Sequence, residues 1–131
     1  MALLQVDPRQ LLYSQCCVKP FFKDGKTVEN TITGLVNGTL SPENIPIMRV
    51  CILPDGTMHS LDNRRLYAFK EAINRGSTFR TVTVERSSNL NSLKWKMNNS
   101  SSENWSQVVN EYLESNHGST EFIKQNSMEF C

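Results

Sequence analysis

The feature that most constrains the fold is a change of hydrophobic period across a turn, in residues 45–76. The run IPIMRVCIL is rich in β-branched and aliphatic side chains and stops at Pro-Asp-Gly, which predicts a strand followed by a tight turn. TMHSL is then the expected return strand. From Arg64 to Gly76 the apolar side chains recur at helical spacing, so we expect a hairpin that leads directly into a helix.

The flanking sequence adds further elements on both sides of this hairpin. Residues 3–13 predict a short strand, a turn and a helical turn. Apolar side chains recur at helical spacing from Val28 to Val36, and the Asn37–Gly38 pair supplies a stop. TFRTVTVER, residues 78–86, alternates as a half-buried strand would. The order helix, strand, strand, helix, strand predicts a compact α+β layer.

One hydrophobic core should unite these elements, because each contributes an apolar stripe or face. The side chains expected in that core are Val28, Ile32, Leu35, Ile47, Val50, Ile52, Leu66, Phe69, Ile73, Val82 and Val84.

The chain of 131 residues suffices for one modest domain, and its composition changes at Ser87. We expect a domain over residues 1–86, and a polar linker with an amphipathic helix over residues 87–131. The stretch SSNLNSLKWKMNNSSSEN is the expected linker. Residues 103–115 form the expected helix, with a capping box at Ser100 and Glu103. The tail after Gly118 is either a short extra turn or a frayed end.

Charge and hydropathy restrict the possible partners. Fourteen basic and thirteen acidic residues give a formal charge of +1, so binding to nucleic acid requires a local patch. The longest apolar runs are only a few residues, which excludes a membrane span. The start, MALLQVDPRQ, has Asp7 and Pro8 where a signal peptide would continue its apolar core. We therefore expect an intracellular protein, nuclear or cytoplasmic, that is not secreted.

The cysteines and histidines show no metal-binding spacing. The four cysteines form no C-x-x-C pair and no zinc pattern; they are Cys16, Cys17, Cys51 and Cys131. We expect free thiols, buried or half-buried, in a reducing compartment. His59 is expected on a strand surface rather than as a ligand, and we expect no metal and no cofactor.

Two adjacent arginines stand at the start of the second helix, in SLDNRRLYAFKEA. Helix beginnings favour negative side chains, so local electrostatics does not explain Arg64 and Arg65. Either one pairs with Asp62 or Glu71 and the other points to water, or both belong to a site for an anion. SLKWKM, residues 92–97, similarly mixes base-stacking and phosphate-binding side chains, or is a linker anchored by one tryptophan.

The segment DGTMHSLDNRRLYAFKEAINRG resembles the signature region of the ParB N-terminal domain, in the ParB/sulfiredoxin superfamily. That family opens a helix with Gly-Glu-Arg-Arg-x-Arg-Ala after a hairpin. Arg64, Arg65 and Ala68 match the motif, whereas Asp62 and Asn63 replace its Gly-Glu and residue 67 replaces its last arginine. VDPRQLLYSQ and the first helix are also similar, so the resemblance covers residues 4–86. It implies a small mixed sheet with packed helices, and the amphipathic helix expected over residues 103–115 is then a C-terminal addition to that ParB/sulfiredoxin-like fold.

The resemblance also implies that this turn approaches phosphates, because helix N-terminal amides and a forked guanidinium suit phosphate oxygens. The expected phosphate- or nucleic-acid-binding residues are Asn63, Arg64, Arg65, Lys70 and Lys19. The activity of sulfiredoxin is excluded, because no cysteine or histidine aligns with its reactive positions and that chemistry needs a thiolate.

The replaced Gly-Glu favours a non-catalytic ParB-like accessory subunit that binds protein partners in a DNA-acting complex, either DNA-modifying or chromatin, with weak sequence-independent DNA contact. The ParB proteins that partition DNA follow this domain with a helix-turn-helix, which residues 87–131 do not predict. The expected partner-binding side chains form one helical stripe: Trp105, Val108, Val109, Tyr112 and Leu113. That stripe packs either on the domain itself or on another subunit.

The alternative is a small nucleotide-phosphate-binding enzyme, a CTP hydrolase or a ParB-like nuclease, in which Arg64 and Arg65 hold phosphates. Against it, the carboxylates nearest the motif, Asp62 and Glu71, do not have metal-ligand spacing.

Overall fold

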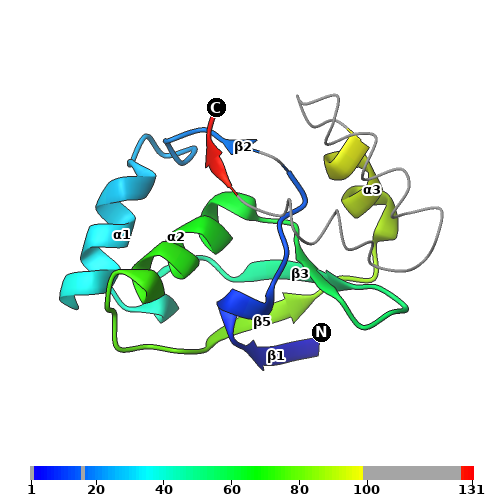
Figure 1. The fold of residues 1–131 in the computed structure, drawn as a ribbon, viewed down its shortest axis with the longest axis horizontal. Coiled ribbons are helices and arrows are strands. Elements are labelled where there is room, and N and C mark those ends of the chain that lie inside the picture. Colours follow the sequence, from blue (N-terminus) through cyan, green and yellow to red (C-terminus); the bar gives the residue numbers. More distant parts are fainter. Residues whose placement is uncertain (1, 16, 99–127) are drawn as a thin grey trace.

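A four-stranded mixed sheet forms the base of the molecule (Figure 1). The computed structural model describes residues 2–15, 17–98 and 128–131. The strands are β1 (Ala2–Val6), β3 (Met48–Ile52), β4 (Met58–Ser60) and β5 (Val82–Arg86), in the order β1-β5-β3-β4. β3 and β5 run parallel, and the other two neighbouring pairs are antiparallel. The expected α+β class and the β3–β4 hairpin are confirmed.

Two helices pack against each other and cover the sheet, α1 (Val28–Asn37) and α2 (Asn63–Asn74) (Figure 1). The Thr27 side chain caps α1 by accepting a hydrogen bond from the Asn30 backbone N–H. Gly38, with φ of 83°, ends α1 in the left-handed conformation that favours glycine. Short 3₁₀ helices follow β1 at Pro8–Gln10 and precede β3 at Pro42–Asn44.

The expected core is confirmed for eight of its eleven side chains. The apolar faces of α1 and α2 are buried against β3 and β5, with Leu66 and Val84 fully buried. The prediction is wrong for Ile47, because this residue is 39% exposed. β3 begins at Met48, whose side chain points into the core, so strand alternation turns its neighbours Ile47 and Arg49 outward. The prediction is also wrong for Ile52, which is half-buried and outside the core cluster, and Ile73 is buried but outside that cluster as well.

The expected linker after Ser87 contains a helix, α3 (Leu90–Asn98). Leu93 and Met97, four residues apart and therefore on one face, are fully buried. The linker interpretation is wrong for these residues, because two well-placed apolar side chains fix a helix whose other positions are polar. Trp95 is 63% exposed on α3.

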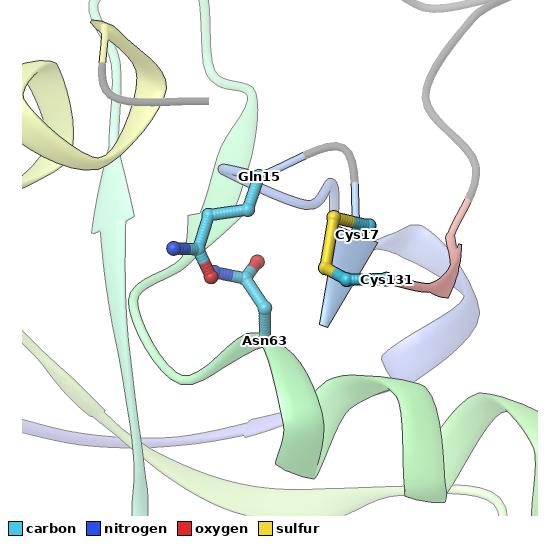
Figure 2. Close-up of a disulfide and its surroundings, with 4 residues drawn as sticks. All are labelled: Gln15, Cys17, Asn63 and Cys131. Carbon is cyan, nitrogen blue, oxygen red and sulfur yellow. A yellow bond between two sulfur atoms is a disulfide. The ribbon is translucent and has the colours of Figure 1, made fainter. Parts of the chain in front are cut away.

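A disulfide joins Cys17 to Cys131 and ties the end of the chain to a second, two-stranded sheet (Figure 2). β2 (Cys17–Val18) pairs in parallel with β6 (Glu129–Phe130), and the Phe130 ring lies 5.2 Å from the ring of Tyr67 on α2. The expectation of free thiols is therefore wrong for this pair, and residues 129–130 form neither an extra turn nor a frayed end. Cys51 is a free, buried thiol, as expected.

His59 lies inside the molecule, which corrects the expectation of a surface position. The segment around Leu12 runs along the outer edge of β4. There the Leu12 N–H donates a hydrogen bond to the Met58 carbonyl, and the Ser60 N–H donates one to the Leu12 carbonyl. This cover leaves the His59 side chain with no exposed area, and burial lowers its pKa to about 4. Among the described residues, no helix is long and apolar enough to cross a bilayer.

Candidate functional site

A cleft of about 680 Å³ opens at the N-terminal end of α2. Its walls come chiefly from the loop before α1, the segment before β3 and the first turn of α2, with Arg49 from β3 and Lys96 from α3. Two acidic side chains, Asp24 and Asp62, line it. Six basic side chains of the described residues line it as well: Lys23, Lys26, Arg49, Arg64, Arg65 and Lys96. The cleft therefore has a local positive charge in a chain whose formal net charge is +1.

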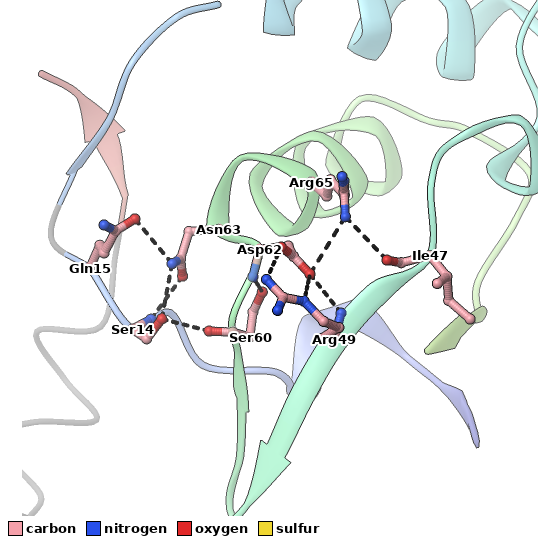
Figure 3. Close-up of polar contacts among 8 residues, drawn as sticks. All are labelled: Ser14, Gln15, Ile47, Arg49, Ser60, Asp62, Asn63 and Arg65. Atoms are coloured by element: carbon pink, nitrogen blue, oxygen red, sulfur yellow. Dashed lines mark hydrogen bonds and ion pairs between the residues drawn. The ribbon is translucent and has the colours of Figure 1, made fainter. Parts of the chain in front are cut away.

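Asp62 is the centre of a charge network at this helix start (Figure 3). Its carboxylate accepts hydrogen bonds from the Arg49 backbone N–H at 2.7 Å and the Arg49 Nη2 at 3.1 Å. Arg65 Nη1 lies 3.5 Å from the same carboxylate. Burial alone would raise the pKa of Asp62, but the hydrogen bonds and positive charges of Arg49 and Arg65 lower it below its ordinary value. Asp62 is thus an ionised carboxylate in the wall of the cleft, already paired with two of the arginines there.

The two adjacent arginines are both anchored by backbone carbonyls. Arg65 Nη1 donates to the Ile47 carbonyl at 3.1 Å, in addition to its pairing with Asp62. Arg64 Nη1 donates to the Phe21 carbonyl at 2.6 Å, and its guanidinium lies 5.9 Å from the Phe22 ring centre. Of the two alternatives, the pairing of one arginine with Asp62 is found for Arg65. Arg64 binds the loop before α1 instead of pointing to water.

Asn63 lines the cleft with its side chain committed to a buried network (Figure 3). Its Oδ1 accepts from the Ser14 N–H at 2.8 Å, and its Nδ2 donates to Ser14 Oγ at 2.9 Å and Gln15 Oε1 at 3.2 Å. Ser14 Oγ donates in turn to the Ser60 carbonyl. Asn63 therefore joins the segment before β2 to the start of α2.

The other two expected phosphate-binding residues lie away from the cleft. Lys19 is exposed just after β2 and does not line it. Lys70 lies further along α2, with its Nζ 4.6 Å from the centre of the Tyr13 ring. Burial lowers the pKa of Lys70 to about 8. The structure thus brings Asn63, Arg64 and Arg65 together and leaves Lys19 and Lys70 outside the cleft.

The sequence did not point to three basic residues of the cleft, Lys23, Lys26 and Arg49, and it offered Lys96 only as one interpretation of SLKWKM. Lys23 and Lys26 flank a turn, and the only signal for Arg49 was a charged residue inside an apolar strand. Burial lowers the pKa of Lys96, and the charges of Arg49, Arg64 and Lys23 lower it further, against the opposing effect of Asp62. The ammonium group of Lys96 is therefore partly buried and close enough to the other basic side chains of the cleft to be repelled by them.

The expected partner-binding stripe lies outside the described residues, so its side chains are not placed. These are Trp105, Val108, Val109, Tyr112 and Leu113, and the capping box at Ser100 and Glu103 lies outside as well. Within the described part of the chain, no cluster of three or more His, Cys, Asp or Glu side chains has a geometry suited to a metal ion.

Comparison with known proteins returned no match. No model of a protein family, no curated protein and no solved structure matches this chain. The resemblance to the ParB N-terminal domain therefore stays a prediction.

Proposed function

We propose that this chain is a non-catalytic, ParB-like accessory subunit of a DNA-acting complex, and that its cleft holds backbone phosphates of DNA. The observation that carries the proposal is the gathering of six basic side chains around the first turn of α2. Helix N-terminal amides and guanidinium groups both stabilise phosphate oxygens, and neither reads the base sequence. The contact is therefore independent of sequence.

The binding should be weak, because the positive charge is confined to one cleft. Asp24 and Asp62 offset part of that charge, so few phosphates can be neutralised. The logarithm of affinity falls with the logarithm of salt concentration in proportion to the number of neutralised phosphates. We expect a shallow dependence on salt.

Fluorescence anisotropy with labelled duplex DNA tests this proposal. Arg64→Ala should weaken binding to every sequence and reduce the salt slope by about one. The matched control is Arg86→Ala, which removes an exposed arginine of β5 that does not line the cleft. Equal effects of the two variants would contradict the proposal, and so would tight binding to one particular sequence.

The proposed protein partner docks on the helical stripe expected over residues 103–115. Joint substitution Trp105→Ala and Tyr112→Ala should abolish capture of the partner in pulldowns and leave the melting temperature nearly unchanged. A collapse of the melting temperature would instead assign the stripe to the chain's own core.

A second candidate is the small nucleotide-binding enzyme, which the volume of the cleft favours. About 680 Å³ falls within the range of small-molecule sites. Incubation with CTP, ATP or GTP and magnesium, with phosphate release measured, separates the two candidates. The accessory-subunit proposal expects no turnover, whereas turnover that Arg64→Ala abolishes would favour the enzyme.

The proposed location is intracellular, in the nucleus or the cytoplasm. Disulfides are rare in those compartments, so this location requires the Cys17–Cys131 bond to open there. Alkylation of thiols in intact cells, followed by mass spectrometry, should find both cysteines reduced. A fully oxidised pair would contradict the location.

A further inference from the structure

A second, smaller groove adjoins the cleft on the side of α3. Its volume is about 380 Å³, and its α3 side is lined by Trp95, Asn91 and Ser92. Arg49, Leu61 and Lys96 line both the groove and the cleft. The two hollows therefore adjoin each other at these three side chains, and an extended ligand that passes over them can reach both.

Trp95 gives the groove a surface on which a flat ring can stack. Its side chain is 63% exposed, yet α3 is held in place by Leu93 and Met97, which are both fully buried. The indole is thus carried by a fixed helix rather than by a loose linker. Asn91 and Ser92 add hydrogen-bond donors and acceptors at the same wall, as the edge of a nucleobase requires.

The shared wall supplies positive charge beside the indole. Arg49 and Lys96 line the groove together with Trp95, and they also line the cleft into which the start of α2 faces. A basic groove that follows the backbone, combined with an aromatic side chain for the bases, is the recurring arrangement in proteins that bind single strands. A duplex lacks the free base faces that such an arrangement needs.

We propose that the groove and the cleft together bind single-stranded DNA, with a base stacked on Trp95 and the neighbouring phosphates held by Arg49 and Lys96. This inference rests on the proposed function, because it takes the cleft to be a phosphate site. It specifies in addition that the DNA is single-stranded, and that Trp95 is the residue that favours a single strand over a duplex.

The test is fluorescence anisotropy of the full chain with a labelled oligothymidylate of about 12 nucleotides, compared with a duplex of equal length. Trp95→Ala should lower affinity for the single strand by about 5- to 150-fold and leave duplex affinity unchanged. Trp95→Phe should retain most of the single-strand affinity, because it keeps an aromatic face. The matched control is Leu90→Ala, an exposed apolar residue of α3 outside the groove, which should change neither affinity.

A spectroscopic measurement locates the stacked base independently of affinity. The chain has two tryptophans, so Trp105→Phe leaves Trp95 as the single reporter. Oligothymidylate should quench its emission, and abasic oligonucleotide of the same length should not. Absence of quenching at saturating oligothymidylate would overturn the inference.

The possible results distinguish the single-strand inference from the proposed phosphate-binding function on which it rests. If Arg64→Ala weakens both DNA forms and Trp95→Ala weakens neither, the phosphate site stands and the stacking groove is overturned. If thymidine monophosphate binds as tightly as the oligonucleotide, the ligand is a free nucleotide and the single-strand inference fails. If Arg64→Ala changes no binding at all, the proposed function fails with it.

Discussion

At the scale of single residues, Asp62 determines how much positive charge the cleft offers to a ligand. Its carboxylate lies within 3.5 Å of both Arg49 and Arg65 and is stabilised in its ionised form by them. A phosphate entering the cleft would interact with the same guanidinium groups. The internal carboxylate and an external phosphate therefore compete for one pair of cations.

Asp62→Asn should strengthen phosphate binding, because it removes the competing negative charge and nearly preserves the shape of the side chain. The expected gain is about 1 kcal/mol, roughly fivefold in affinity, as is typical of one partly exposed ion pair. Titration with inorganic pyrophosphate measures it. Asp7→Asn, which removes a carboxylate paired with Arg9 outside the cleft, is the control and should change nothing. Weaker binding by Asp62→Asn would show that the carboxylate orients the arginines instead.

The buried His59 makes stability depend on pH. Its pKa is about 4 in the folded chain and about 6.5 when exposed, so the unfolded state binds more protons between these values. Stability is therefore lost as the pH falls through that interval, by about 2 kcal/mol from pH 7 to pH 5. Urea unfolding at the two pH values measures the loss. His59→Gln should remove most of the difference; an unchanged difference would assign the effect to other groups.

At the scale of elements, the sequence was sufficient where periodicity and stop signals agreed. α1 and α2 carry full apolar stripes closed by glycines, and β3 and β5 carry concentrated β-branched side chains, so all four were predictable. α3 was not predictable from the sequence, because Leu93 and Met97 are the only buried apolar side chains described on it and its other positions are mostly polar. β2 and β6 are two residues each and depend on a pairing between the two ends of the chain, which local pattern does not encode.

The packing of α3 gives a direct prediction. Leu93→Ala should lower the free energy of unfolding by about 2–5 kcal/mol, because it removes a fully buried side chain. Leu90→Ala, on the exposed side of the same helix, should cost less than about 0.5 kcal/mol. Chemical denaturation of both variants measures the difference. Equally small losses of unfolding free energy in the two variants would contradict the packed helix and support a linker over residues 90–98.

At the scale of the whole molecule, the candidate site is assembled from parts that are distant in the sequence. Arg64 and Arg65 were predictable because they are adjacent and open a helix. Lys23, Arg49 and Lys96 come from a loop, a strand and a third helix, and only the folded chain brings them to the same cleft. Lys70 shows the converse error, because its place on α2 directs it to Tyr13 instead.

The disulfide should contribute to global stability because it joins two cysteines that are 114 positions apart in the sequence. Reduction with dithiothreitol should lower the free energy of unfolding by about 2–5 kcal/mol, chiefly by freeing the unfolded chain. Cys17→Ser should show the same loss and no further response to dithiothreitol. A wild-type chain whose unfolding does not change on reduction would contradict a structural role for the bond.

The central claim is that the start of α2 holds a phosphate, and an NMR titration of the ¹⁵N-labelled chain tests it most directly. Inorganic pyrophosphate added at low salt should shift the backbone amides of residues 62–65 and the side-chain guanidinium signals of Arg49 and Arg64. Amides of β1, which is separated from the cleft strands by β5 in the sheet, should not move. Shifts confined to the sheet, or spread evenly over all exposed lysines and arginines, would contradict the account.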